Sequence, residues 1–157
     1  FRRVLFRSEI RRKYHADRIY IIQFHNGGIF YTNSPMQKAS VTFERCSDGL
    51  ERISDHMQHM FVSHYNWFIK QTLKGELFYT DCENMEDVAT KALFRKFGTQ
   101  ATAAVPIYDI QDQLVSIMVM DWVFSEISSD FISGEKFNQE FKEEMVMDAE
   151  SVGNLVI

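Results

Sequence analysis

Two apolar runs flank a short polar turn in residues 99–124, and this is the clearest pattern in the chain. Successive residues of a strand point to opposite faces of a sheet, so apolar residues at both sets of positions are typical of a central strand covered on both sides. Residues 17–24, DRIYIIQF, have this two-sided pattern. The second run has it too, with Leu114, Met118, Met120, Trp122 and Phe124 on one predicted face and Val115, Ile117, Val119 and Val123 on the other.

The remaining elements follow from helical spacing, short apolar runs and turn residues. Residues 25–35, HNGGIFYTNSP, are predicted as a loop because of their glycines and the Asn-Ser-Pro sequence. The order of elements places hairpins near both ends, which predicts an α+β fold around an antiparallel sheet. Helices are predicted at 9–16, 54–73, 84–97 and 134–157, and further strands at 38–45 and 77–80.

The composition limits the class of protein. A chain of 157 residues, 45% hydrophobic with 14 Phe, is expected to form one domain with a substantial core. The net charge of −5 argues against binding to nucleic acid or to an anionic membrane surface. Two cysteines provide no disulfide framework, and we expect a cytoplasmic protein, or one on the cytoplasmic side of a membrane if an anchor precedes this segment.

Residues 1–8, FRRVLFRS, match the translation of the end of a common sequencing adapter. We therefore expect a non-native segment, followed by a single domain in residues 9–157 that is truncated at its N-terminus, as in an assembled environmental fragment. The alternative is a genuine helical turn with Val4 and Leu5 facing inward. The segment carries three Arg and no acid, so without it the net charge changes from −5 to −8.

The hairpin resembles the hallmark stretch of the GAF family and, more loosely, its PAS-like relatives. The matching positions are Val105-Pro106-Ile107, before the polar turn, and the apolar strand 114–121. This resemblance implies an antiparallel sheet of five to six strands, with the terminal helices on one face and a pocket on the other. It implies a sensor or regulatory domain that binds a small molecule. The chain has neither the cysteine position of the tetrapyrrole-binding members nor a cyclic-nucleotide signature, so the ligand and cofactor stay unknown.

Candidate ligand-binding positions surround the end of the first strand. His25 and Asn26 are polar groups at the exit of a central strand, and Gly27 allows a close approach to the backbone. The alternative is a turn at Asn26-Gly27 that is held by a local hydrogen bond of His25. Asp121 lies in an apolar strand, where a buried carboxylate needs a partner or a raised pKa; it could equally bind a loop N–H at the strand end. The full candidate set is Phe24, His25, Asn26, Gly27, Phe30, Tyr31, Thr102 and Asp121.

Other reactive residues support no catalytic or metal site. His56 and His59 are neighbours on a predicted helix, but His64 faces elsewhere and no zinc motif accompanies them. Cys46 and Cys82 do not match the cysteine spacing of GAF-type methionine sulfoxide reductases, and acids flank Cys82. We therefore expect no enzymatic activity.

Two functional hypotheses remain open. The first is a non-catalytic, small-molecule-binding sensor or signal-input domain. The second is a ligand-free interaction or homodimerisation module, acting through its terminal helices, of a larger and possibly membrane-anchored bacterial or phage protein. A polar void beside His25 favours the first hypothesis, whereas a cavity filled by Phe and Met side chains favours the second.

Overall fold

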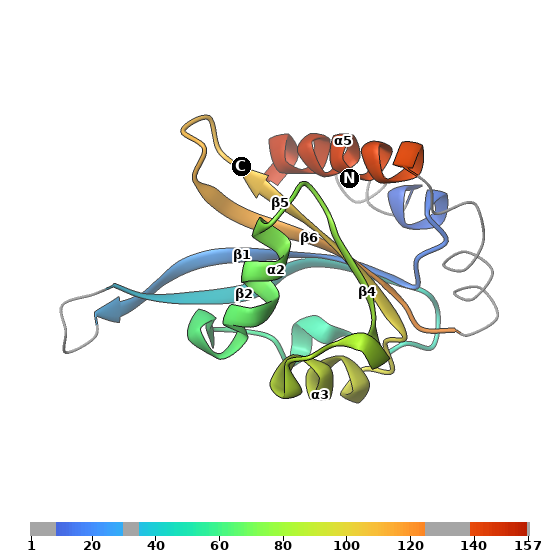
Figure 1. Cartoon of the computed structure of the whole chain (residues 1–157), viewed down its shortest axis with the longest axis horizontal. Helices are drawn as coiled ribbons and strands as arrows, with labels where there is room; N and C mark the ends of the chain where they lie inside the picture. Colours follow the sequence, from blue (N-terminus) through green and yellow to red (C-terminus); the bar gives the residue numbers. More distant parts are fainter. Residues whose placement is uncertain (1–8, 30–34, 125–138, 157) are drawn as a thin grey trace.

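The computed structural model describes residues 9–29, 35–124 and 139–156. Its centre is a six-stranded antiparallel sheet with the strand order β3-β2-β1-β6-β5-β4 (Figure 1). This confirms the predicted α+β class and the central positions of β1 and β6. The strands are β1 (Arg18–Ile29), β2 (Pro35–Cys46), β3 (Met60–Phe61), β4 (Phe78–Asp81), β5 (Ala101–Tyr108) and β6 (Leu114–Trp122).

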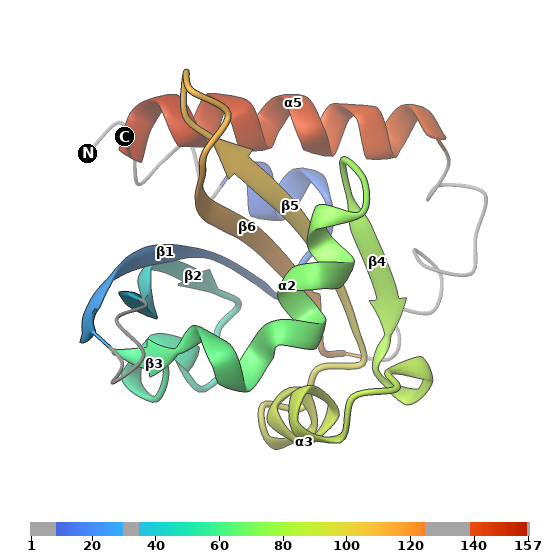
Figure 2. The same cartoon turned by 60° about the vertical axis from the view of Figure 1, so that its left-hand side comes forward.

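Helices cover both faces of this sheet, as the two-sided strands require. The helical segment 9–13 and α5 lie over one face, and α2 and α3 lie over the other (Figure 2). None of the helices in the described ranges is both long and apolar enough to span a membrane. The helices are α2 (Asn66–Leu73), α3 (Val88–Lys96) and α5 (Gln139–Val156), with 3-10 turns η1 (Ile53–Asp55), η2 (Val62–Tyr65) and η3 (Cys82–Asn84).

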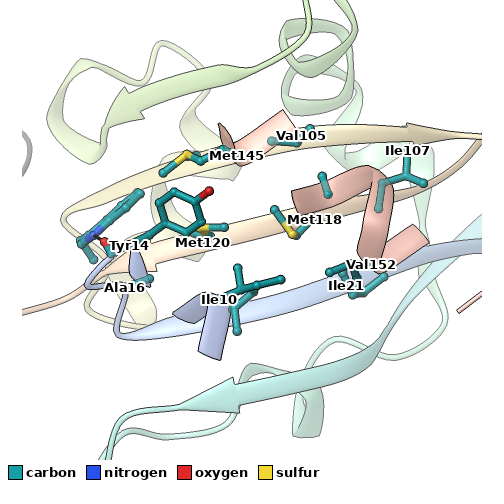
Figure 3. Packing of buried hydrophobic residues seen from close by; sticks show 14 of the residues in the cluster. Ile10, Tyr14, Ala16, Ile21, Val105, Ile107, Met118, Met120, Met145 and Val152 are labelled. Carbon is teal, nitrogen blue, oxygen red and sulfur yellow. Dashed lines mark hydrogen bonds between the residues drawn. The ribbon is translucent and has the colours of Figure 1, made fainter. Parts of the chain in front are cut away.

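The layer under α5 is a continuous apolar core. Met118 and Met120 of β6 lie against Met145 and Val152 of α5, with Ile10 from the N-terminal helical segment beside them (Figure 3). Each such side chain contributes about 1.5–3 kcal/mol when fully buried. A polar contact joins the two terminal segments, because the Tyr14 hydroxyl donates to the Asp148 carboxylate, which also pairs with Lys13 at 3.0 Å.

Three local predictions were wrong. β1 extends as far as Ile29 and β2 begins at Pro35, so residues 25–29 and 35 of the loop predicted at 25–35 are strand. The helix predicted at 54–73 is divided into η1, β3, η2 and α2; His59 has a left-handed φ of 52°, which no helix interior accommodates. Leu114 contacts the α2 and α3 layer instead of the Met118 side, because the pairing of β5 with β6 is irregular next to Tyr108.

Gly153 sets the distance between α5 and β5. A Cβ at this position would lie 2.6 Å from Cγ2 of the buried Ile107, closer than atoms normally approach. The branched Ile107 side chain is held in the strand and cannot swing away as a flexible side chain would. The helix can therefore lie this close to the sheet only because residue 153 has no side chain.

Replacing this glycine tests the contact. Gly153→Ala is expected to lower the free energy of unfolding by about 1–2 kcal/mol, because overpacking outweighs the gain in helix propensity. Urea denaturation measures the change. Gly75→Ala is the matched control, since its added Cβ meets no atom within 4 Å and the variant should be as stable as the parent or slightly more stable. Equal stabilities of the two variants would contradict the close approach.

Candidate functional site

A small cavity lies between the sheet and helices α2 and α3, on the face where the GAF resemblance implies a pocket. Its volume is about 40 Å³. The hydroxyl of Thr90, one of the few polar side chains in the lining, already donates to Asp87 at 2.7 Å. The lining residues are Tyr20, Ile22, Phe24, Ala39, Met57, Met60, Val62, Tyr65, Phe68, Ile69, Thr90, Leu93, Phe94 and Ile117.

The size and chemistry of this cavity restrict its contents. Pockets for ordinary small-molecule ligands measure roughly 300–1,000 Å³, so this arrangement accommodates only something far smaller. Aromatic side chains occupy much of the surrounding space: the rings of Phe68 and Phe94 are 5.7 Å apart, and those of Phe68 and Phe78 are 6.2 Å apart. An almost entirely apolar lining also gives water few hydrogen-bond partners.

Glu44 positions part of the cavity wall. This buried carboxylate accepts hydrogen bonds from the backbone N–H groups of Ile53 and Ser54, at 2.8 and 3.2 Å. These bonds hold η1 against β2 and place Ile53 and Met57 in the apolar layer. A charged residue in β2 thus fixes this segment through hydrogen bonds to its backbone.

A buried polar cluster lies on the same face of the sheet, toward the end of β6. Arg18 pairs directly with Asp121 across β1 and β6, and Thr102 pairs with Asp121 across β5 and β6. Both Asp121 and Arg18 are almost completely inaccessible. Thr102 donates to Asp121 Oδ1 at 2.9 Å, Thr99 donates to Oδ2 at 3.3 Å, and Arg18 Nη1 is 3.8 Å from Oδ2.

Arg18 also connects this cluster to the chain around it. Its Nη2 donates to the carbonyl of Phe97, just beyond α3, at 2.8 Å, and its Nε donates to the carbonyl of Glu51 at 3.3 Å. One guanidinium therefore ties the end of α3 and the segment after β2 to the central strands. Arg18 is not among the candidate residues predicted from the sequence; the available signal was a cation at the start of a strand that is otherwise apolar on both faces.

Burial controls the protonation of Asp121. Removal from water raises the pKa of its carboxyl to about 6, although Arg18 and the hydroxyls of Thr102, Tyr20 and Thr99 favour the charged form. Tyr20 experiences the complementary effect, since burial and the nearby Asp121 raise the pKa of its phenol well above the ordinary value. Two environments were predicted for Asp121: a buried carboxylate with partners or a raised pKa, and a carboxylate bound to a loop N–H. The structure shows the first, with side-chain partners and a raised pKa.

The other candidate residues are not gathered around this cluster. Phe24 lines the cavity, six residues and so about 20 Å along β1 from Arg18. The next side chain, His25, points to the opposite face, where its Nε2 lies 2.8 Å from the Ser40 hydroxyl and its ring 5.1 Å from that of His59. Asn26 and Gly27 belong to β1, and Phe30 and Tyr31 lie outside the described residues. Ligand binding by all eight candidates stays a prediction.

The cysteines and histidines show no reactive arrangement in the described part of the chain. Burial raises the pKa of the Cys82 thiol, and burial together with Glu44 raises that of Cys46 to about 11, whereas a nucleophilic thiol needs a lowered value. Within residues 9–29, 35–124 and 139–156, no three His, Cys, Asp or Glu side chains are placed to hold a metal ion. His56 contacts Glu51 at 2.6 Å and is part of no such group.

Comparison with known proteins identifies the fold. No family model matches the sequence, and no curated protein matches it either. Among solved structures, the GAF3 domain of Slr1393 from Synechocystis sp. PCC6803 in its photoproduct state is 14% identical, with a TM-score of 0.65 over 98% of this chain and 90% of that chain. The red/green cyanobacteriochrome NpR6012g4 in its red-absorbing state is 13% identical, with a TM-score of 0.71 over 97% and 89%. A phycocyanobilin-bound GAF domain from a cyanobacterial phytochrome is 14% identical, with a TM-score of 0.64 over 94% and 79%. The chain therefore has a GAF-like fold, as the hairpin resemblance predicted.

Removing Arg18 tests the buried cluster. Arg18→Leu leaves the buried Asp121 carboxyl without its cation and the carbonyls of Phe97 and Glu51 without this donor, so the free energy of unfolding is expected to fall by about 3–5 kcal/mol. Chemical denaturation provides the measurement. The exposed Arg95→Leu should change it by less than about 0.5 kcal/mol. A small effect at Arg18 would show that water or a neighbour replaces it without cost.

The raised pKa of Asp121 makes stability depend on pH. Between about pH 4 and pH 6 the folded protein retains a proton that the unfolded chain has released, so stability should fall as the pH rises through this window. The total is at most about 3 kcal/mol. The side chain of Asp121→Asn cannot titrate, so the variant should lack this pH dependence. The difference in unfolding free energy between the parent and the variant, measured against pH, therefore gives the contribution of Asp121. A parent that gains stability with rising pH relative to Asp121→Asn would mean that Arg18 lowers the pKa below its ordinary value.

Proposed function

We propose that this chain is a non-catalytic regulatory domain that keeps its pocket filled with its own side chains and acts through contacts with other protein segments. The supporting observation is the cavity of about 40 Å³, lined by apolar side chains that include three Phe and two Met, where a GAF-like domain would hold a ligand. This is the arrangement that favours an interaction module over a small-molecule sensor. Such a domain passes on changes through its terminal helices, which are linked here by Tyr14 and Asp148.

A small-molecule sensor is the second candidate, supported by the space that remains. Met57 and Met60 line the cavity, and the unbranched, flexible methionine side chain can rearrange around a guest. A ligand that entered by this route would be apolar, because the lining offers it almost no free polar group. It would also be compact, since the cavity measures only about 40 Å³.

Native mass spectrometry of the full chain, purified from a bacterial host, tests the two candidates. The interaction module predicts a mass equal to that of the polypeptide or a multiple of it, and the same polypeptide mass after denaturation. A small mass that is present in the native spectrum and lost on denaturation would overturn the filled-pocket proposal and identify the ligand.

Phycocyanobilin is a sharper probe, because one of the similar structures is a GAF domain bound to it. Incubation with this pigment should leave the chain colourless after gel filtration, since the cavity is too small for a tetrapyrrole and neither Cys46 nor Cys82 lines it. A phycocyanobilin-binding GAF domain treated in parallel provides the positive control. A coloured product that survives denaturation would show that the pocket opens and that a thiol reacts.

A further inference from the structure

A second depression in the surface lies away from the cavity, beside the tip of the β5–β6 hairpin. It is bounded by this hairpin, by the turn between α2 and β4, and by the C-terminal half of α5, and its volume is about 420 Å³. Figure 2 shows the hairpin near the C-terminal end of α5 and the turn between α2 and β4 below the middle of that helix. We call this surface the hairpin groove. Its lining residues are Glu76, Pro106, Ile107, Tyr108, Asp109, Asp112, Val146, Glu150, Gly153 and Asn154.

The floor of the hairpin groove is apolar and rigid. Pro106 and Ile107 belong to a buried strand, and Gly153 brings α5 against Ile107 without a side chain between them. Two large apolar side chains of the hairpin are accessible: Tyr108, which lines the groove at the end of β5, is 45% exposed, and Ile110, in the turn that follows, is fully exposed. An isoleucine that is completely exposed on a turn buries none of its apolar surface in the domain itself, so it is available to a partner.

The walls of the hairpin groove are acidic. Four of its lining residues are carboxylates and none is Lys or Arg. Asp109 is partly engaged, since its Oδ1 accepts the backbone N–H groups of Gln111 and Gln113 at 2.8 and 3.0 Å. Within the described ranges, Glu76, Asp112 and Glu150 form no ion pair. The groove therefore combines an apolar floor with unpaired negative charge.

This charge suits a polypeptide better than a metal ion. A bound cation needs several oxygen ligands at a single point, and no three acidic side chains in the described part of the chain converge in that way. Separated carboxylates match separated ammonium or guanidinium groups, as on a peptide with Lys or Arg at successive positions. An apolar floor between them fits the apolar side chain of such a peptide.

We infer that the hairpin groove docks a segment of a partner protein in which Lys or Arg residues flank an apolar side chain. Charge argues against a second copy of this chain as the occupant: its net charge is −5, and its arginine-rich residues 1–8 are the segment expected to be non-native. This inference rests on the proposed function in one respect: it names a surface for the protein contacts proposed there. The groove and the cavity share no lining residue. Failure of peptide binding would leave the mass spectrometry result unaffected, so the two proposals can fail independently.

The test is a titration of the full, ¹⁵N-labelled chain with an amphipathic peptide of alternating Leu and Lys, followed by amide NMR. A peptide of the same length with Glu in place of Lys is the ligand control. The variant Asp112→Lys/Glu150→Lys reverses the charge of the groove. The matched variant Asp48→Lys/Glu86→Lys makes the same change in net charge at exposed acids outside the groove.

The Lys peptide is expected to shift the amides of residues 106–112 and 146–154, whereas the Glu peptide should shift none. Charge reversal in the groove should weaken binding by about ten-fold or more, and the matched variant by less than about two-fold. Equal weakening by both variants would overturn the inference, since it would mean attraction by overall charge. Undetectable binding, or shifts confined to other surfaces, would also overturn it. If the groove variant instead dissociates a dimer, the occupant is a second copy and the separate partner is excluded.

Discussion

The structure depends on one constraint: the two central strands, β1 and β6, carry apolar side chains on both faces. An antiparallel pair of this kind cannot leave either face to water, so each face needs its own covering layer. On one side this layer is α5 with the N-terminal helical segment, and on the other it is α2, α3 and the 3-10 turns. Gly153 and the Tyr14–Asp148 contact follow from the first layer, because both allow the terminal segments to lie close to the sheet.

The second layer explains the character of the candidate site. The strand face beneath α2 and α3 is apolar along most of its length and polar toward one end, where Arg18, Thr102, Asp121 and, on β2, Glu44 are buried. There the charges satisfy one another and fix the end of α3, so they serve the architecture before any ligand. The rest of the face is filled by Phe, Met and Ile side chains, which leave a cavity much smaller than the pockets that hold ordinary ligands. The same packing that stabilises the domain therefore argues for regulation through protein contacts.

Much of the fold could be predicted from local patterns, while the site could be predicted only in part. The hairpin with Val105-Pro106-Ile107, the two-sided strands and the antiparallel arrangement all agree with the structure. The prediction of a helix at 54–73 was wrong because apolar spacing does not reveal the left-handed backbone at His59 or the strand pairing of Met60 with Ala39. His25 was selected as a polar group at the exit of β1; the structure places its side chain beside Ser40, on the face opposite to Phe24, and its ligand binding stays a prediction.

The sequence by itself determined the α+β class, the burial of the central strands and the presence of a carboxylate at Asp121 that needed partners. These depend on side-chain periodicity within one segment, which is a local property. Only the tertiary structure decided that Arg18 is the cation facing Asp121, that Phe68 and Phe94 close the cavity, and that Glu76, Asp112 and Glu150 border one groove. These residues are far apart in the chain, so their distances are set by strand register and by the volumes of the side chains packed between them.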